Sequence, residues 1–477
     1  MKIAIAASEA VPFSKTGGLA DVAGTLFKEY LAMEHDALLF IPFYKKTSED
    51  FGHSISYSGI EFDIPLGSAV RRCKIFTAIS GGSVPNIYFI GNEDFFFRED
   101  LYGSSAGDYP DNDQRFVFFS KGVLEICKRF DLSVDIMHCN DWQTALIPLY
   151  MKTLYRHVPV LKKTASVLTI HNVGYQGIFP RQTMDIIGLG MSFFNPEGIE
   201  FYGKVNFLKA GILEADLITT VSKTYAEEIR SPEFGFGLDG VLRKRGKFVV
   251  GILNGIDYAE WDPFTDMYLP QNYEASNLSG KQDCRIRFMK KISFDLSAAG
   301  PLMCFIGRLS SQKGLDLLAD AMPYLAGLGS GIVVIGRGDE RYHAMLNEVS
   351  KHYSRRFHFH TGFDEPFAHL AYAGSDMFLM PSQYEPCGLG QMIAMRYGTL
   401  PVAYRTGGIS DTVEDKNTGF LFEEYSLPSF VRAVKKAVKT FDNKKTWKQM
   451  MCNAMSKDFS WKKSAQEYIT IYQNTLK

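Results

Sequence analysis

The sequence predicts an α/β protein built from two Rossmann-like, doubly wound lobes that face each other across a cleft. Short apolar runs of strand length alternate with helix-length amphipathic segments along most of the chain. This alternation is typical of a parallel sheet with helices on both faces. A stretch rich in Asp, Pro, Tyr and Asn at 257–280 interrupts the series once. The chain of 477 residues is also too long for one ordinary core, since domains hold roughly 100–200 residues each.

The first lobe is expected to comprise residues 1–250. It opens with a strand at 3–6, a turn that contains Gly17 and Gly18, and an amphipathic helix at 19–31. Further helices are expected at 113–130 and 144–155. The other predicted strands of this lobe are 38–41, 86–90, 135–138, 166–170 and 217–221.

The second lobe is expected to comprise residues 251–458. Its predicted strands are 302–306, 331–335, 356–359, 377–380 and 400–404. The remaining segment, 459–477, predicts a helix with no strand after it, which could pack back on the first lobe. Ligands of open α/β sheets bind at the carboxyl ends of the strands, so we expect the site in the cleft between the two lobes.

Composition argues against several classes of partner. The net charge is −1, from 52 basic and 53 acidic residues, so no electrostatic reason exists to expect nucleic acid or an anionic membrane. The first apolar run stops at Glu9, too early for a signal peptide, and no run approaches the ~18–20 apolar residues of a membrane span. The seven cysteines form no CxxC pair and indicate reduced thiols in a cytoplasmic protein. Nothing in the sequence indicates an oligomeric state.

A glycine pair follows the first predicted strand, in the run 14–22. Gly17 and Gly18 at a helix start would let backbone N–H groups approach an anion, and Lys15 adds a mobile cation. A plain tight turn is an equally good interpretation of two glycines alone. The segment fits neither G-x-G-x-x-G nor the P-loop pattern, which argues against a dehydrogenase or an NTPase.

An ordered set of segments carries a resemblance to a known family. They are Lys15-Thr16-Gly17-Gly18-Leu19-Ala20-Asp21-Val22, Asn140-Asp141-Trp142-Gln143, Thr169-Ile170-His171-Asn172-Val173-Gly174-Tyr175-Gln176-Gly177, Asn254-Gly255-Ile256-Asp257, Ile306-Gly307-Arg308-Leu309-Ser310-Ser311-Gln312-Lys313-Gly314, Pro381-Ser382-Gln383-Tyr384-Glu385-Pro386-Cys387-Gly388-Leu389 and Arg405-Thr406-Gly407-Gly408-Ile409-Ser410-Asp411-Thr412-Val413. Together they resemble the bacterial glycogen synthase and plant starch synthase family, from residue 3 to about 420. The resemblance implies the GT-B glycosyltransferase architecture, with the acceptor on the first lobe and the nucleotide-sugar on the second.

The resemblance also implies an activity. It is retaining transfer of glucose from ADP-glucose to the non-reducing end of an α-1,4-glucan, such as glycogen or a maltooligosaccharide, with release of ADP. No metal and no pyridoxal phosphate is expected. The departing phosphate would help to deprotonate the attacking hydroxyl on the same face of the sugar. Lobe closure would exclude water and bring Lys15 to the diphosphate. No carboxylate pair at a glycosidase-like spacing can be assigned, so no double-displacement nucleophile is predicted.

Residue roles follow from the same resemblance. The catalytic residues would be Glu385, His171, Arg308, Lys313 and Asp141. The donor-binding residues would be Lys15, Gly17, Gly18, Asn254, Tyr384, Cys387, Gly388, Leu389, Thr406 and Gly407. The acceptor-binding residues would be Asp21, Tyr102 and Asn172.

The chemistry of these side chains suits sugar transfer. Arg308 can bridge two phosphate oxygens and Lys313 supplies a point charge, so together they would clamp the diphosphate, although a solvated loop is the alternative. Glu385 would contact glucose hydroxyls and stabilise positive charge at the anomeric carbon. His171 would face the donor glucose, although a lone histidine is more often structural. Cys387 has no adjacent base and is better interpreted as a packed neighbour than as a nucleophile.

Competing interpretations lead to different chemistry. Asp111-Asn112-Asp113 fits the D-x-D pattern of metal-dependent transferases, but it precedes a helix, so we favour helix capping over a manganese site. A related two-lobed transferase, such as a sucrose synthase-like enzyme or one that uses UDP-glucose, is the nearest alternative. A phosphorylase would need a pyridoxal-phosphate lysine. A catalytically inactive glucan-binding homologue is a further alternative, against which the intact basic and acidic residues argue.

Overall fold

The chain forms two compact units. The computed structural model describes residues 1–104, 107–294, 300–362 and 364–477. The N-terminal unit comprises Met1–Ile252 with Ser464–Lys477, and the C-terminal unit comprises Leu253–Lys463. From the sequence alone, the boundary between the two lobes was expected after residue 250, and the C-terminal segment was expected to begin at residue 459. In the described ranges, no helix is long and apolar enough to cross a bilayer.

The N-terminal unit is built on a nine-stranded sheet with the order β14-β13-β9-β8-β1-β2-β5-β4-β3. Its parallel strands are β1 (Lys2–Ala6), β2 (Asp36–Pro42), β5 (Ile87–Gly91), β8 (Ile136–Asn140), β9 (Ala165–Ile170), β13 (Leu217–Thr220) and β14 (Val249–Gly251). Strand order reverses between β1 and β8, which pair although they are distant in sequence. Such a switch point is where doubly wound sheets bind ligands.

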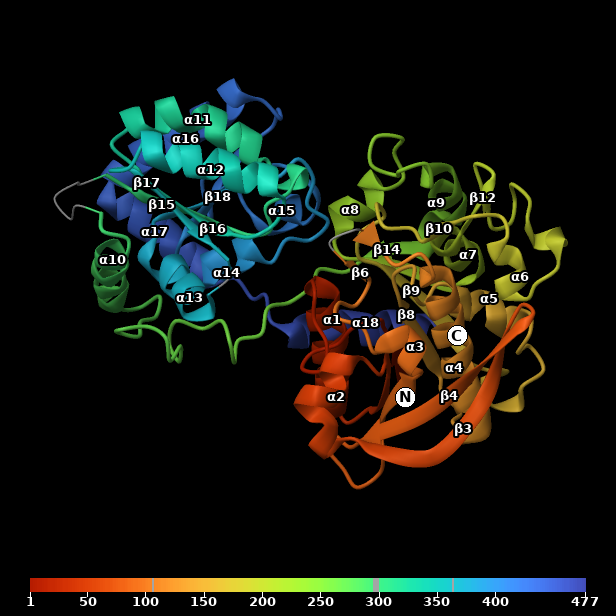
Figure 1. Ribbon diagram of the computed structural model, residues 1–477. Helices are drawn as coiled ribbons and strands as arrows, with labels where there is room; N and C mark the ends of the chain where they lie inside the picture. The colour runs from red at the N-terminus through yellow and green to blue at the C-terminus, as the bar shows by residue number, and fades with distance from the viewer. Residues whose placement is uncertain (105–106, 295–299, 363) are drawn as a thin grey trace. The chain divides into compact units, whose positions relative to one another are not determined.

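An antiparallel pair extends this sheet beyond β5. Strands β3 (Ser56–Leu66) and β4 (Ala69–Ala78) form the long twisted hairpin drawn in orange in Figure 1. The sequence interpretation did not predict it. Along β3 the buried side chains alternate with exposed ones, as expected for a strand with one solvated face.

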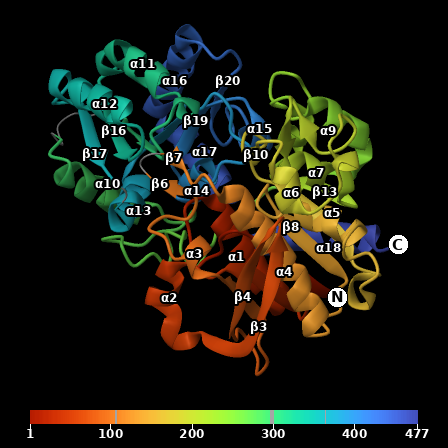
Figure 2. The same cartoon turned by 45° about the vertical axis from the view of Figure 1, so that its right-hand side comes forward.

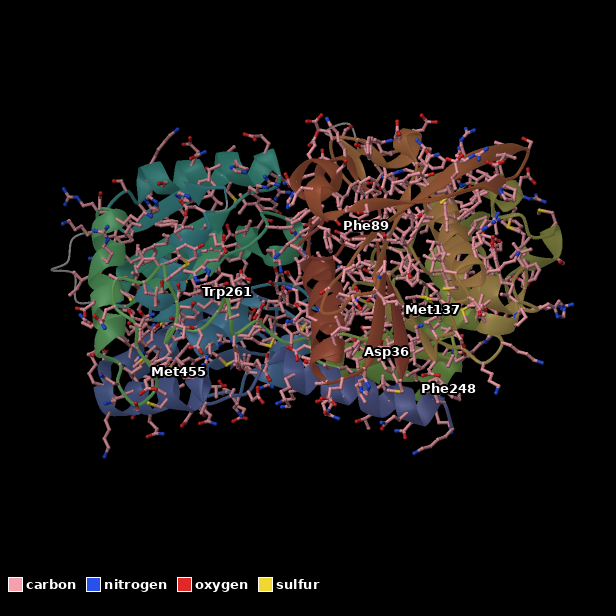
Figure 3. All side chains as sticks on the ribbon, turned by 90° about the horizontal axis from the view of Figure 1, so that it is seen from below. Asp36, Phe89, Met137, Phe248, Trp261 and Met455 are labelled. Carbon is pink, nitrogen blue, oxygen red and sulfur yellow. The ribbon has the colours of Figure 1, made fainter. Side chains whose placement is uncertain are left out.

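Helices and short strands complete the N-terminal unit. The helices are α1 (Gly18–Ala32), α2 (Lys45–Phe51), α3 (Glu93–Phe96), α4 (Asn112–Arg129), α5 (Leu146–Lys152), α6 (Thr183–Ile187), α7 (Phe207–Glu214), α8 (Lys223–Glu228) and α9 (Asp239–Arg245). The short strands are β6 (Gly103–Ser104), β7 (Gly107–Asp108), β10 (Ile178–Phe179), β11 (Glu200–Phe201) and β12 (Lys204–Asn206). Apolar strand residues such as Phe89 and Met137 are fully buried in this unit (Figure 3).

The C-terminal unit contains a six-stranded sheet that is parallel throughout. Its strands are β15 (Leu302–Ile306), β16 (Gly331–Gly336), β17 (Phe357–Thr361), β18 (Met377–Met380), β19 (Leu400–Tyr404) and β20 (Phe420–Phe422). The order β17-β16-β15-β18-β19-β20 is the Rossmann order 3-2-1-4-5-6, with its switch point between β15 and β18. The predicted fold class, two Rossmann-like doubly wound sheets, is confirmed.

Helices flank this second sheet. They are α10 (Ser279–Lys291), α11 (Leu315–Gly327), α12 (Glu340–His352), α13 (Glu365–Gly374), α14 (Gly390–Arg396), α15 (Gly407–Thr412), α16 (Leu427–Asp442) and α17 (Lys444–Met455). Each predicted strand of both lobes overlaps an observed one, because a buried parallel strand needs an unbroken apolar run.

The last helix, α18 (Trp461–Thr475), returns to the N-terminal unit. The buried Tyr472 hydroxyl lies 2.8 Å from His138 Nδ1 and 2.9 Å from the Tyr30 hydroxyl. His138 Nε2 in turn lies 2.6 Å from Thr169 Oγ1. The first two bonds attach α18 to α1 and β8, the third joins β8 to β9, and α18 lies next to β8 in Figure 1 and Figure 2.

Candidate active site

A lysine and a glutamate form an ion pair at the switch point of the C-terminal sheet. Lys313 follows β15 and Glu385 follows β18, and their Nζ and Oε2 atoms lie 2.6 Å apart. Both side chains are largely buried, at 17% and 9% exposure. Parallel strands bring these two loops to one edge of the sheet, although 72 residues separate them in sequence.

Close backbone contacts hold the two loops together. Gln312 donates from Nε2 to the Tyr384 carbonyl at 3.0 Å, and the Gln383 amide donates to the Gln312 carbonyl at 2.8 Å. Gly314 has a φ of +69°, and a Cβ there would lie 1.8 Å from the Pro381 carbonyl oxygen. Only glycine therefore fits where the Lys313 loop crosses the Glu385 loop.

A third loop, at the end of β19, packs against the backbone of Glu385. Gly407 has a φ of +41°, and a Cβ there would lie 2.1 Å from the Glu385 carbonyl oxygen. The Gly408 amide donates to the same carbonyl at 3.1 Å. Thr406, directly before these glycines, is buried. The structure thus brings the predicted Thr406-Gly407 turn next to the predicted catalytic glutamate.

The remaining predicted residues of this unit differ in environment. Arg308 is exposed at the carboxyl end of β15, and Tyr384 is partly exposed. Asn254 is buried beside Cys387, and its Oδ1 atom has no hydrogen-bond partner within the described chain. Burial raises the pKa of the Cys387 thiol to about 12, so the thiol stays neutral and cannot act as a nucleophile.

Gly388 and Leu389 complete this loop. Gly388 has a φ of +73°, which favours glycine, and both residues are partly exposed directly before α14.

A buried carboxylate holds the glycine loop of the N-terminal unit. Glu9, three residues after the end of β1, accepts hydrogen bonds from the Thr16 amide, from Thr16 Oγ1 at 3.0 Å and from the Tyr102 hydroxyl at 3.2 Å. The Tyr102 hydroxyl also lies 2.6 Å from Ser8 Oγ. Burial raises the pKa of Glu9 above its ordinary value. Tyr102, a predicted acceptor residue, is therefore part of the support for the Lys15 loop.

The two glycines at the start of α1 are not required by local geometry. Gly17 is extended, with φ −156°, and a Cβ at Gly17 or Gly18 would meet no atom within 4 Å. Open space beside these backbones leaves room for a ligand. Lys15 is half exposed and pairs with Asp21 at 2.7 Å.

Asp141 and His171 meet at the ends of β8 and β9. The His171 amide donates to Asp141 Oδ1 at 2.7 Å. Burial, followed by the nearby charge of Glu9, raises the pKa of Asp141 to about 7. His171 Nε2 lies 3.0 Å from Asn140 Oδ1, while the Asn140 amide nitrogen donates to the Ala6 carbonyl. This arrangement places the proton of His171 on Nε2 and leaves a lone pair on Nδ1.

Burial lowers the pKa of His171 to about 3, so its imidazole is neutral near pH 7. Asn172, the predicted acceptor residue beside it, uses its Oδ1 atom to accept from the Gly174 amide at 2.9 Å. Its side chain therefore shapes the turn after β9.

The sequence alone did not predict a role for two polar residues of this site. Glu9 supports the Lys15 loop, and Asn140 sets the tautomer of His171. Both stand at the carboxyl end of a predicted parallel strand, which is the signal that could have identified them.

The D-x-D segment is not a helix cap of the predicted kind. Asp111 occupies the cap position of α4 but makes no side-chain cap bond, because Arg98 takes both its oxygens at 2.7 and 2.6 Å. A bidentate guanidinium outcompetes a single backbone N–H. Asp113 accepts from the Gln114 amide and from Thr183 Oγ1, each at 2.7 Å. Both carboxylates are thus engaged by protein groups.

Comparison with known proteins assigns the family. Residues 2–244 match the starch synthase catalytic domain, and residues 290–451 match glycosyl transferases group 1. The chain is 47% identical to a glycogen synthase of Thermodesulfovibrio yellowstonii, over 100% of this chain and 98% of that protein. The chain belongs to the glycogen and starch synthase family. A glycogen synthase of Thermotoga maritima is 42% identical, over 100% of this chain and 99% of its own length.

Solved structures of glycosyltransferases share the family's fold. The catalytic domain of starch synthase IV from Arabidopsis thaliana, bound to ADP and acarbose, superposes with a TM-score of 0.90 at 30% identity, covering 100% of this chain and 99% of that one. A sucrose-phosphate synthase from Thermosynechococcus elongatus has a TM-score of 0.61 at 15% identity, over 99% and 98% of the two chains, and shows the fold alone. The protein is a glycosyltransferase of GT-B architecture.

Proposed function

We propose that this enzyme transfers glucose from ADP-glucose to the non-reducing end of an α-1,4-glucan, with retention at the anomeric carbon and release of ADP. The observation that carries the proposal is the Lys313–Glu385 pair at the switch point of the C-terminal sheet. Nucleotide ligands of doubly wound sheets bind at this point. The relatives named glycogen synthase, and the starch synthase bound to ADP and acarbose, support this donor and this acceptor.

The C-terminal unit would stabilise the leaving group. The bond from C1 of glucose to the diphosphate breaks, and Arg308 and Lys313 offset the negative charge that develops on the diphosphate. Glu385, held beside Lys313, would bind glucose hydroxyls and stabilise positive charge at C1. The new bond forms from the acceptor hydroxyl to the same face of C1. Its proton passes to the departing phosphate oxygen, so atoms and charge balance without a protein nucleophile.

The unpaired Oδ1 of Asn254 supports its proposed role as a ligand for the donor, because a hydroxyl donor would satisfy it. Tyr384, Cys387, Gly388, Leu389, Thr406 and Gly407 are the further donor contacts that we propose on this unit.

The N-terminal unit would position both sugars. His171 is neutral near pH 7, so we propose that it binds a glucose hydroxyl through its Nδ1 lone pair and does not act as an acid. Asp141 would accept from a second hydroxyl. Lys15 would reach the diphosphate, with the open backbones of Gly17 and Gly18 beside it. Asp21, Tyr102 and Asn172 remain the proposed acceptor residues.

A coupled assay tests this function. We expect ADP release from ADP-glucose only when glycogen or a maltooligosaccharide is present, and a much lower rate with UDP-glucose. Faster turnover of UDP-glucose would favour the UDP-glucose transferase. Glucan binding without any response to either donor would favour the inactive homologue.

The proposed transfer needs neither a metal nor pyridoxal phosphate, because Arg308, Lys313 and Lys15 supply the positive charge. We expect full activity in the presence of a chelator and no cofactor absorbance from pyridoxal phosphate. Loss of turnover on chelation that Mg²⁺ or Mn²⁺ restores would contradict this part of the proposal. We place the reaction in the cytoplasm.

Substitution of Lys15 tests its proposed contact with the donor. Because Lys15 is 52% exposed and its pair with Asp21 lies near the surface, Lys15→Ala should change stability by less than about 1 kcal/mol. The loss of a cation at the diphosphate should lower kcat on the order of 10²-fold. Lys45→Ala removes another exposed, ion-paired lysine and serves as the matched control. Equal rates for the two variants would refute the assignment of Lys15.

A further inference from the structure

Three potential metal ligands converge on the C-terminal unit, on elements that the transfer reaction does not use. His369 lies on α13, and Glu365 lies one turn before it on the same helix. Glu260 lies in the turn that begins at Asp257. One nitrogen or carboxylate oxygen from each of the three lies within 4.8 Å of the other two, and no other group of this kind occurs in the part of the chain that the structure describes.

The buried histidine is oriented as a metal ligand would be. His369 is 1% exposed, and its Nδ1 atom lies 2.8 Å from Asp266 Oδ2 and 3.2 Å from the Tyr397 hydroxyl. Tyr397 also donates to Asp266 Oδ2 at 2.5 Å, so this carboxylate accepts both bonds. Because the Asp266 carboxylate can only accept, Nδ1 is the nitrogen that donates, and Nε2 is the nitrogen that remains for a metal. A carboxylate on the remote nitrogen is the usual support of a metal-bound histidine.

The lone pair on Nε2 has no partner in the described chain. The atom is buried and makes no hydrogen bond to any described residue. The indole of Trp261, labelled in Figure 3, stacks on the His369 imidazole with 4.0 Å between ring centroids and 11° between planes. This stacking fixes the orientation of the imidazole. Since Asp266 and Tyr397 engage Nδ1, Nε2 is the nitrogen left to meet a ligand. A buried acceptor without a partner is costly and calls for an explanation.

We propose that His369, Glu260 and Glu365 bind one divalent cation of the zinc class. A neutral imidazole nitrogen with two carboxylates suits Zn²⁺ and its neighbours in the transition series, whereas Mg²⁺ and Ca²⁺ prefer oxygen ligands alone. The cation would fill the empty coordination position of Nε2 and offset the repulsion between two neighbouring carboxylates. Ligands of tetrahedral zinc stand about 3.3 Å apart, so the two exposed glutamate side chains must move inward slightly. Water would take the remaining position.

The bound cation would have a structural role. Glu260 belongs to the segment that leads into the C-terminal unit, whereas Glu365 and His369 belong to α13. A cation shared by all three ties this segment to α13. None of the three has a role in the proposed sugar transfer, so the inference stands independently of that function.

Metal binding to the untagged, chelator-stripped protein tests the site. We expect one Zn²⁺ to remain per chain after gel filtration, and Tm to rise by roughly 4 °C or more at saturating Zn²⁺. Co²⁺ should give the visible absorption bands of a tetrahedral site, and Mg²⁺ or Ca²⁺ should not displace it. The rate of glucose transfer at a temperature far below Tm should not change on stripping.

Substitution of an exposed ligand separates this site from adventitious binding. Glu365→Gln removes one ligand without disturbing the buried His369–Asp266 pair, and we expect at least 10-fold weaker Zn²⁺ binding and loss of the Tm rise. Glu340→Gln is the matched control, because Glu340 is also an exposed glutamate at the first position of a helix, α12. Equal Zn²⁺ affinity in the two variants, no retained metal in the parent protein, or a Ca²⁺ preference would each overturn the proposal.

Discussion

At the turn after β8, Asp141 combines an unusual backbone with a buried carboxylate. Its φ of +55° lies in the left-handed region, which Asp and Asn tolerate better than other residues that carry a Cβ. Its side chain is 9% exposed and accepts the His171 amide. Burial and the charge of Glu9 raise its pKa to about 7, so the protein holds a carboxyl group that changes charge near neutrality. Such perturbed groups cluster at functional sites.

The raised pKa predicts how stability depends on pH. Between pH 3.8 and about 7 the folded state keeps a proton on Asp141 that the unfolded chain has released. This group therefore stabilises the fold at low pH, and its contribution is lost as the pH rises through 7. In Asp141→Asn the neutral amide keeps both the φ preference and the acceptor oxygen. The unfolding free energy of this variant minus that of the parent should therefore be roughly 2–3 kcal/mol larger at pH 8.5 than at pH 5.

Urea unfolding of both proteins at the two pH values measures this gain. In parallel, kcat of Asp141→Asn should fall by roughly 10–100-fold, because a charge-assisted bond to a hydroxyl is lost. An identical stability difference at both pH values would mean that the Asp141 carboxyl is not perturbed in the folded state.

The family resemblance proposed roles for Asp141, His171, Lys313 and Glu385, and each of them stands in a loop after a predicted strand. Glu9 also follows a strand, but its role depends on contacts with Thr16 and with Tyr102, which lies 93 residues away in sequence. A contact over such a distance leaves no periodic signal in one sequence. The same limit applied to Asp111, whose partner Arg98 could not be recognised from its spacing.

At the level of elements, parallel strands were easier to predict than antiparallel ones. Strands such as β1 and β15 are buried on both faces and read as unbroken apolar runs. The β3–β4 hairpin has one exposed face, so Phe62, Ile64 and Leu66 alternate with polar residues and Pro65. A proline is tolerated there because β3 is the edge strand. The same hydrophobic criterion thus finds strands that are buried on both faces and misses a hairpin with one solvated face.

The loop crossing at Gly314 yields a prediction for one element. A Cβ at this glycine would lie 1.8 Å from the Pro381 carbonyl oxygen and must push the β15 and β18 loops apart. Gly314→Ala should therefore cost about 3 kcal/mol or more, and kcat should fall because Lys313 and Glu385 separate. Thermal unfolding and the ADP-release assay measure the two effects.

Gly329→Ala provides the matched control within the same unit. Gly329 has a similar φ of +73°, but a Cβ there would meet only an Arg356 nitrogen at 4.0 Å. This variant should show only the cost of the left-handed backbone, about 1–2 kcal/mol, with unchanged kcat. If the two variants behave alike, the crossing of the loops is not what requires glycine at 314.

On the scale of the whole chain, the C-terminal helix completes the N-terminal unit. The sequence predicted a helix in the segment 459–477, without a following strand, that could pack back on the first lobe. The partner surface is formed by residues hundreds of positions earlier, such as Tyr30 and His138. Burial lowers the pKa of His138 to about 3, so this histidine is a neutral structural group between Tyr472 and Thr169. Only the folded structure shows that these polar atoms meet.

This arrangement predicts that a substitution in the C-terminal helix α18 destabilises the strands at the start of the chain. Tyr472 is fully buried, and Tyr472→Ala removes its ring and leaves His138 Nδ1 and the Tyr30 hydroxyl without their partner. We expect a loss of about 3–5 kcal/mol in the stability of the N-terminal unit. Hydrogen exchange should accelerate in β1 and β8 but not in β15 and β18, because the latter belong to the other compact unit. Gln473→Ala, at an exposed position of the same helix, is the control and should leave hydrogen exchange unchanged in all four strands. If Tyr472→Ala accelerates exchange in both compact units, the two cores are not independent.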